Sequence, residues 1–282
     1  MKAQETQTSN CRPLLGLPAI EELLDLPSVD FPAELLPYRD ALLAIAKPAA
    51  TFEAQPASSV IDPKASKMGG IPFTPIYTDW PSSMIQEGHV SRKRPQAFIG
   101  QFNFAEIVAA VPELKGVVPS KGLLQLFYDL EEFPWGEYPK DFNFVSTWWY
   151  PDIDEQTHRP MDQGTASYPE REYGLKFTYR PSLPETPYLP DDIELPEELE
   201  DIYFEAFVYD QHHQIAGYPL PIQDDPMEEL SEGEPWQLLL QIDSDEKMKI
   251  NWADGGTIYL GIDTNDLSTA DLSQARLIVQ TC

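Results

Sequence analysis

Three short blocks of this sequence occur twice in the same order, and this repetition constrains the fold more than any other feature. Each pair of blocks shares a turn or a strand-like run with matching glycines, prolines or glutamines. One match of this length would carry little weight, but three in order indicate an internal duplication. The pairs are 70–73 (GIPF) with 217–220 (GYPL), 95–106 (PQAFIGQFNFAE) with 235–246 (PWQLLLQIDSDE), and 122–129 (GLLQLFYD) with 256–263 (GTIYLGID).

The duplication predicts two β units related by a pseudo-twofold axis and sharing one core, because a lone small sheet cannot bury both faces. The alignment equates Gln101 with Gln241 and Gly122 with Gly256. Both glutamines interrupt apolar strands, where a buried amide without partners costs about 1–3 kcal/mol. Two explanations remain open. The glutamines bond reciprocally to backbone across the pseudo-twofold axis, or they hold a polar ligand group between the units.

The remaining pattern is mainly β with a helical beginning. Apolar residues recur at helical spacing in LPAIEELLDL and PAELLPYRDALLAIAK, and Pro48 prevents continuation of the second helix. After residue 50, short aromatic and branched runs separated by prolines indicate strands, with one short helix at LPEELEDI. We predict a mainly β (α+β), roll-like fold with a helical segment at 1–50 and a β domain at 51–282. Within that domain, unit one covers 66–130, a connector 130–200 and unit two 201–282.

The chain is strongly acidic, and its charge is unevenly distributed. Lys and Arg number 19 against 47 Asp and Glu, which gives a formal charge of −28. Residues 181–246 hold 19 acids and no Lys or Arg. This charge excludes a nucleic-acid binder that works through a basic face. The acidic stretch is consistent either with carboxylates that serve solubility alone or with a docking surface for a basic partner.

Two further features indicate location. No run approaches about 18 apolar residues, and the polar start lacks the apolar run of a secretory signal, so we expect a cytoplasmic protein without a membrane span. Cys11 and Cys282 are expected to be reduced thiols, with a bridge between them as the open alternative.

The motifs predict no metal, cofactor or catalytic set. His212 and His213 have no His or Cys partner at metal spacing, and we expect His213 to hydrogen-bond the turn at 217–219. DSDEK and DTNDL lack the Gly and Glu of a calcium loop. NWADGG predicts a tight turn around Asp254, because Gly255 and Gly256 allow the backbone to take positive φ. Neither a phosphate loop nor a GxSxG motif is present.

Several of these elements resemble the YwqG-like family of bacterial proteins. The resemblance runs from about Ser66 to Cys282 and rests on SKMGGIPFTP, AFIGQFNFAE, HQIAGYPLPIQDD, PWQLLLQIDSD and NWADGGTIYLGI. The family often has Gly where this chain has Ala253, a small-for-small change that we expect to matter little. The resemblance implies a mainly β, roll-like, duplicated fold and supplies no catalytic residue. Some members look like parts of toxin and immunity loci.

Two function hypotheses follow. The first is a cytoplasmic binding protein, rather than an enzyme, of the immunity type, with a basic protein partner and with no nucleic acid, membrane or cofactor. The second is a small-molecule-binding or hydrolase site between the duplicated units, favoured if His213 and Asp254 reach one site. Its candidate lining residues are Trp80, Gln101, His213, Gln241, Trp252 and Asp254.

Overall fold

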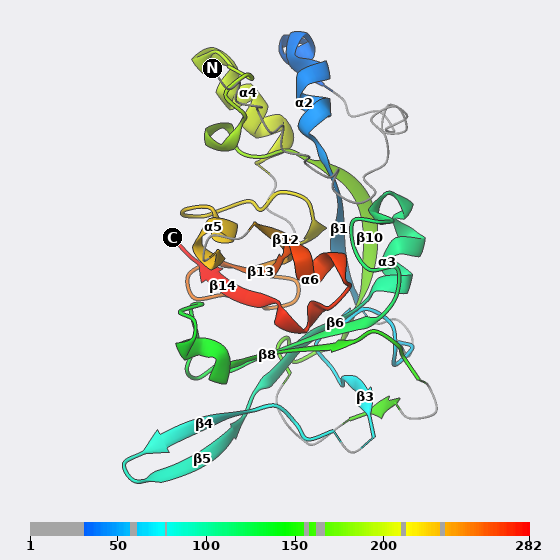
Figure 1. Ribbon diagram of the computed structural model, residues 1–282, viewed down its shortest axis with the longest axis vertical. Coiled ribbons are helices and arrows are strands. Elements are labelled where there is room, and N and C mark those ends of the chain that lie inside the picture. The colour runs from blue at the N-terminus through cyan, green and yellow to red at the C-terminus, as the bar shows by residue number, and fades with distance from the viewer. Residues whose placement is uncertain are drawn as a thin grey trace, which may run out of the picture.

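A mainly β architecture, as predicted, is built on one ten-stranded, nearly closed sheet (Figure 1). The computed structural model describes residues 31–56, 61–76, 78–154, 158–161, 167–209, 213–231 and 235–282. The first predicted helix, together with Cys11 and His212, lies outside the described residues.

The strands of the large sheet alternate along the chain with short helical pieces and two small sheets. In spatial order the large sheet contains β14 (Arg276–Gln280), β13 (Thr257–Asp263), β12 (Trp236–Asp243), β11 (Gln214–Ala216), β1 (Lys47–Pro56), β10 (Tyr173–Ser182), β2 (Lys67–Met68), β6 (Ala97–Asn103), β7 (Leu123–Tyr128) and β8 (Val145–Tyr150). The small sheets pair β3 (Phe73–Pro75) with β9 (His158–Pro160) and β4 (Ser82–Glu87) with β5 (Val90–Pro95). The α-helices are α2 (Arg39–Ile45), α3 (Phe104–Ala110), α4 (Glu197–Phe207), α5 (Pro226–Leu230) and α6 (Thr264–Ser268). The 3₁₀ turns are η1 (Ala33–Tyr38), η2 (Pro112–Leu114), η3 (Lys140–Asn143), η4 (Thr186–Tyr188) and η5 (Leu272–Gln274).

The strand order is symmetric about the centre of the large sheet, which supports the duplication. Strands β2, β6, β7 and β8 follow one another on one side, as β11, β12, β13 and β14 do on the other. The ladder of β6 with β7 is irregular between Phe98 and Gly100, and that of β12 with β13 between Leu238 and Leu240. These are the positions that the sequence alignment equates.

Each unit is preceded in the chain by a strand that pairs with the other unit. Strand β1 precedes unit one in the chain but lies beside β11, whereas β10 precedes unit two but lies beside β2. The two strands pair with each other along their whole length, from Lys47 opposite Ser182 to Pro56 opposite Tyr173. Strand structure therefore begins before residue 51, and the interval 130–200 contains β8, β9 and β10 as well as connecting segments.

The two ends of the sheet approach each other, so the roll almost closes. The hydroxyl of Thr147 on β8 donates to the carbonyl of Ala275 at 3.2 Å, and the amide of Val279 on β14 donates to the carbonyl of Trp135 at 3.1 Å. Side chains from both units then fill a single core. Its fully buried members include Ile99, Phe102, Phe104, Leu126, Leu240, Ile242, Trp252 and Leu260.

The N-terminal helical segment packs against α4 rather than on the main core. Leu35, Leu42 and Tyr203 are completely buried in this second cluster. In an α-helix the ring of Pro37 would clash with the carbonyl four residues earlier, which agrees with the predicted helix beginning as the 3₁₀ turn η1. The helix ends at Ile45, and Pro48 follows in β1, as predicted.

Two neighbouring glycines in the turn before β13 serve different purposes. Gly255 has a φ of +71°, as predicted, with open space around it. Gly256 does not use the positive φ that glycine allows, since that residue lies outside the left-handed region. A side chain at 256 would instead place Cβ 2.3 Å from the carbonyl oxygen of Gln280. Close approach of the backbone therefore requires glycine there.

Ala253 has a φ of +53°, a conformation that is unfavourable for every residue except glycine. The Ala253→Gly variant is expected to raise the free energy of unfolding by about 0.5–1 kcal/mol, because it relieves this strain. The measurement is urea denaturation, with Ala206→Gly as control. Ala206 is exposed in α4, where glycine should cost about 1 kcal/mol. Equal losses in both variants would show that Ala253 is unstrained.

Candidate functional site

Gln101 and Gln241 are both completely buried and make the same first contact. The side-chain oxygen of Gln101 accepts from the amide of Phe73, and that of Gln241 from the amide of Leu220, each at 3.0 Å. Phe73 and Leu220 end the matched blocks GIPF and GYPL. The predicted burial is confirmed, but each glutamine bonds backbone of its own unit, so the expected bonding across the pseudo-twofold axis is wrong.

The side-chain amide nitrogen of Gln101 also has partners within the protein. Its amide nitrogen donates to the carbonyls of Pro63 and Ala65, both at 2.8 Å. The facing strand completes each network in the same way, because the amide of Gln125 donates to the Phe73 carbonyl at 3.0 Å and the Tyr259 hydroxyl to the Leu220 carbonyl at 2.6 Å. Both networks therefore hold a turn against the sheet rather than a ligand.

His213 is connected to Gln241 through Asp243. The Gln241 amide donates to Oδ1 of Asp243 at 3.2 Å, and the backbone amide of Asp243 donates to Nδ1 of His213 at 3.1 Å. Since a backbone N–H can only donate, Nδ1 is an acceptor and the ring proton belongs on Nε2. Nε2 lies 3.2 Å from Oδ2 of Asp245, and the ring stacks on Phe52.

The turn at 217–219 is held by the next residue, so the hydrogen bond expected from His213 is wrong. The side-chain amide of Gln214 donates to the carbonyls of Ala216 at 2.7 Å and Tyr218 at 2.8 Å. In unit one, Ser66 stands four residues before Gly70, as His213 stands before Gly217, and its hydroxyl accepts from the amide of Asn103 at 2.9 Å. The His213 contact is thus a variant of a structural bond that both units contain.

Asp243 and Asp245 have opposite electrostatic environments. Oδ1 of Asp243 accepts from the Thr257 hydroxyl at 2.8 Å, while Oδ2 is buried without a partner among the described residues. Burial raises the pKa of Asp243 to about 6, and the hydrogen bond from His213 lowers the pKa of Asp245 to about 2. Two neighbouring carboxyl groups whose pKa values are shifted in opposite directions can serve as an acid and a base. Asp243 is only 5% exposed, however, and lies enclosed within the sheet.

The remaining predicted site residues lie apart from this network. Trp252 is completely buried and packs edge-on against Tyr128 and Tyr168. Asp254 is in an exposed turn, where its carbonyl accepts from the Thr281 hydroxyl at 3.2 Å. His213 and Asp254 share no contact partner in the part of the chain that the structure describes.

Trp80 lies in a third place, at the root of the hairpin formed by β4 and β5. Its indole nitrogen donates to the Gln96 carbonyl at 2.8 Å, and its ring packs edge-on against Phe127. The structure therefore joins Gln241 with His213 and does not gather all six residues at one site.

The helical end of the molecule, uppermost in Figure 1, exposes many carboxylates. Apart from Asp40, which pairs with Arg39 at 3.3 Å, none of them forms an ion pair with a Lys or Arg that the structure describes. On α4, Phe204 is 42% exposed and contacts Tyr209, which is 68% exposed. We name this surface the acidic helical face, and it comprises Asp191, Asp192, Glu194, Glu197, Glu198, Glu200, Asp201, Phe204, Glu205 and Tyr209.

A shallow hollow of about 230 Å³ lies where the two ends of the large sheet meet. Its walls come from β8 of unit one and η5 of unit two, so it lies between the units. Gln101 does not line it, although Trp148 in its wall is only two strands away, because Gln125 of β7 stands opposite both residues. Arg276 lies over the rings of Tyr138 and Phe142. The lining residues are Tyr138, Phe142, Val145, Ser146, Thr147, Trp148, Ser273, Gln274 and Ala275.

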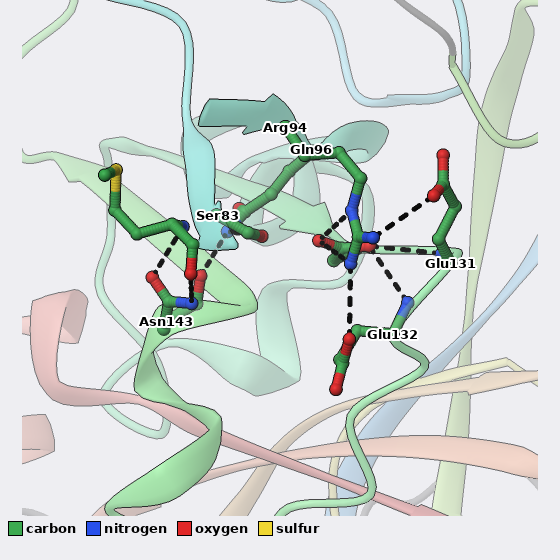
Figure 2. Close-up of polar contacts among 8 residues, drawn as sticks. Ser83, Arg94, Gln96, Glu131, Glu132 and Asn143 are labelled. Carbon is green, nitrogen blue, oxygen red and sulfur yellow. Dashed lines mark hydrogen bonds and ion pairs between the residues drawn. The ribbon is translucent and has the colours of Figure 1, made fainter. Parts of the chain in front are cut away.

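A ring of carboxylates fixes Arg94 at the root of the projecting hairpin (Figure 2). Its guanidinium binds Asp129 at 2.9 Å, Glu131 at 3.1 Å and Glu132 at 3.4 Å. The second oxygen of Asp129, a residue 1% exposed, accepts from the backbone amides of Glu131 and Glu132. Within the run Arg92-Lys93-Arg94, this arginine is therefore committed to the fold.

The other side of the root is tied to η3 (Figure 2). The buried amide of Gln96 donates to the hydroxyl of Ser83 at 3.4 Å and to the carbonyl of Asn143 at 3.2 Å. The side chain of Asn143 in turn accepts from the Met84 amide at 2.9 Å and donates to the Met84 carbonyl at 3.0 Å. The hairpin is thus held at a defined angle to the sheet.

Comparison with known proteins places the chain in a family. None of its described helices is long and apolar enough to cross a membrane, and no group of three His, Cys, Asp or Glu side chains among the described residues could hold a metal ion. A search of the curated proteins finds no significant match. The model of a domain of unknown function, DUF1963, matches residues 66–282, which is most of the chain and includes the strands of both units except β1. The chain therefore belongs to the DUF1963 family.

Proposed function

We propose that this protein is a binding protein, not an enzyme, and that it docks a basic protein partner on the acidic helical face. The supporting observation is the exposed pair Phe204 and Tyr209 on a surface whose carboxylates form no ion pair with any described Lys or Arg. Exposed aromatic side chains supply the anchors of protein interfaces. Surrounding charges of one sign speed association with partners of the opposite sign and exclude others.

The positions on α4 suit this role. Glu198, Asp201 and Glu205 are all exposed, and Asp201 lies one helical turn from Phe204 and Glu205. The helix itself is held by buried Tyr203, whose hydroxyl donates to the Pro184 carbonyl at 2.6 Å. A partner would therefore meet carboxylates on a firmly seated helix.

Within the DUF1963 family we propose the finer assignment to YwqG-like proteins, supported by the motifs HQIAGYP, WQLLLQIDSD and NWADGG. That resemblance favours an immunity-type role in the bacterial cytoplasm, in which the partner is a basic toxin. An immunity protein must occlude its partner rather than transform it, which agrees with a site built from carboxylates and aromatic rings instead of a catalytic set.

The test begins with capture of the partner from the native host at low salt, followed by purification and measurement of its affinity. We expect a basic partner whose affinity falls at least about tenfold in the triple variant Glu198→Gln, Asp201→Asn, Glu205→Gln, and falls with added salt. A partner of acidic charge, or binding that salt does not weaken, would contradict the proposal.

A matched control separates the local surface from total charge. The triple variant Glu53→Gln, Asp79→Asn, Glu170→Gln removes the same number of charges from exposed positions outside the acidic helical face. Binding should stay within about twofold of the wild type, since at physiological salt charges act over about 8 Å. An equal loss of affinity in both triple variants would show that the net charge of the protein, and not the acidic helical face, determines binding.

The hollow between β8 and η5 supports a second candidate function, a small-molecule site between the units. The observation in its favour is the combination of aromatic walls with the polar side chains of Ser146 and Gln274. None of Gln101, His213 and Gln241 lines this hollow, so the site would use residues other than those expected from the sequence.

A further inference from the structure

The hairpin of β4 and β5 extends away from the body at the end opposite the acidic helical face (Figure 1). The two strands form a sheet of their own, and every residue from Val90 to Lys93 is exposed. A two-stranded hairpin is marginally stable in water when it stands alone. The bonds at its root, from Arg94 to Asp129 and from Asn143 to Met84, therefore hold in place an arm that covers little of the protein.

The duplication shows that the core does not need this arm. The interval between the blocks GIPF and PQAF contains the hairpin, whereas the equivalent interval of unit two, at 221–234, contains α5. Met227 and Leu230 of α5 are buried against Tyr259 and Ile278 of the sheet. Unit two thus uses the interval to cover the sheet, while unit one projects it into solvent.

One edge of the arm is closed and the other is open. The Asn143 side chain bonds both backbone groups of Met84, so these groups point away from β5. In an antiparallel pair the residue opposite also points its groups outward, and so do residues two positions on. Lys93 lies opposite Met84 and Ser91 opposite Gln86. No hydrogen bond from a described residue outside the hairpin reaches the backbone of Lys93 or Ser91.

The open edge is basic, in a protein of net charge −28. Arg92 and Lys93 are exposed on opposite faces of β5, and Arg92 shares its charge with Glu87 at 3.4 Å. Strands of six residues reach about 20 Å, well beyond the charge-screening distance of about 8 Å at physiological salt. The arm therefore presents its own positive charge, with Met84 and Val90 as exposed apolar neighbours.

We propose that the outer edge of β5 binds an extended, acidic segment of a partner protein as a third strand of the hairpin. The outward backbone groups of Ser91 and Lys93 supply the main-chain hydrogen bonds of strand addition. Arg92 and Lys93 select carboxylates on the added segment, and the exposed Val90 of β5 contacts its apolar side chains. This site is separate from the acidic helical face. It binds an acidic segment, whereas the acidic helical face binds a basic partner.

The experiment measures fluorescence anisotropy of a labelled eight-residue peptide of alternating Glu and Thr, titrated with the full chain. We expect saturable binding that weakens at least about fivefold between 50 and 300 mM salt. The double variant Arg92→Glu, Lys93→Glu should lose at least tenfold in affinity. An equally tight complex with a Lys–Thr peptide would overturn the proposal, as would tighter binding of a single-stranded oligonucleotide.

Two proline variants at paired positions of the hairpin distinguish binding by strand addition from binding by charge alone. Ser91→Pro removes an outward N–H from the open edge, and Gln86→Pro removes one from the edge that carries Asn143. Neither removes a backbone bond between β4 and β5, and both lose the same side-chain bond, from the Gln86 amide to the Ser91 hydroxyl at 2.6 Å. Ser91→Pro should weaken binding at least tenfold, while Gln86→Pro binds as the wild type does. Equal effects of the two variants, or undiminished binding of a peptide N-methylated at every residue, would overturn strand addition.

Discussion

The Gln241→Glu variant is expected to lose more than about 3 kcal/mol of unfolding free energy at pH 7. The side-chain amide of Gln241 now donates to Oδ1 of Asp243 at 3.2 Å. Glutamate would place a second carboxyl against that oxygen in a buried site, where two such groups cannot both ionise. Its oxygen can still accept from the Leu220 amide, so the loss measures charge rather than shape. The measurement is urea denaturation at pH 7.

The control for this variant is Gln237→Glu in the same strand. Gln237 is exposed, and the same substitution should change stability by less than about 0.5 kcal/mol. Gln241→Leu, which leaves the Leu220 amide without its acceptor, should lose about 1–3 kcal/mol. A Gln241→Glu protein as stable as Gln237→Glu would show that the amide network carries no weight.

The Asp243→Asn variant is expected to remove a large pH dependence of stability. Burial raises the pKa of Asp243 to about 6 from an ordinary value of 3.8. The folded state thus binds this proton more tightly than the unfolded state, so ionisation destabilises the fold fully above pH 6 and not at all below pH 3.8. The wild type should gain about 2 kcal/mol from this group as pH falls from 7 to 4. Asparagine should show no such gain, as measured by denaturation at each pH.

Asp245 provides a control of opposite sign. The hydrogen bond from His213 lowers the pKa of Asp245 to about 2, so its contribution is present above pH 3.8 and lost as pH falls through 2. Asp245→Asn should therefore be destabilised at neutral pH, with no change in slope between pH 4 and 6. An Asp243→Asn protein that keeps the wild-type slope there would assign the dependence to another group.

The sequence predicted the duplicated blocks and the burial of Gln101 and Gln241 because both depend on short-range patterns. An amide within an apolar strand must find partners, and repeated glycines mark the turns that supply them. The contacts of His213 depend on the register of β11 against β12 and on the turn after Asp243. Spacing along the chain does not contain that information.

Two other features of the fold could not be predicted from the sequence pattern, for physical reasons. The strands β1 and β10 exchange between units, and their sequences KPAATFEAQP and YGLKFTYRPS share no block that would reveal their equivalence. The hairpin is exposed on both faces, so it lacks the alternation of apolar and polar residues that marks a strand. Its signal was the two-residue turn at Gly88, where φ is +64°.

The central claim is that the duplicated core is a scaffold and that the acidic helical face binds a basic protein. Hydrogen–deuterium exchange of the full chain, alone and saturated with its captured partner, tests this most directly. The account predicts that protection increases over residues 191–209, with the strands around Gln101 and Gln241 unchanged. Protection over 145–148 and 273–275 instead, with α4 unaffected, would place the site in the hollow between the units and contradict the claim.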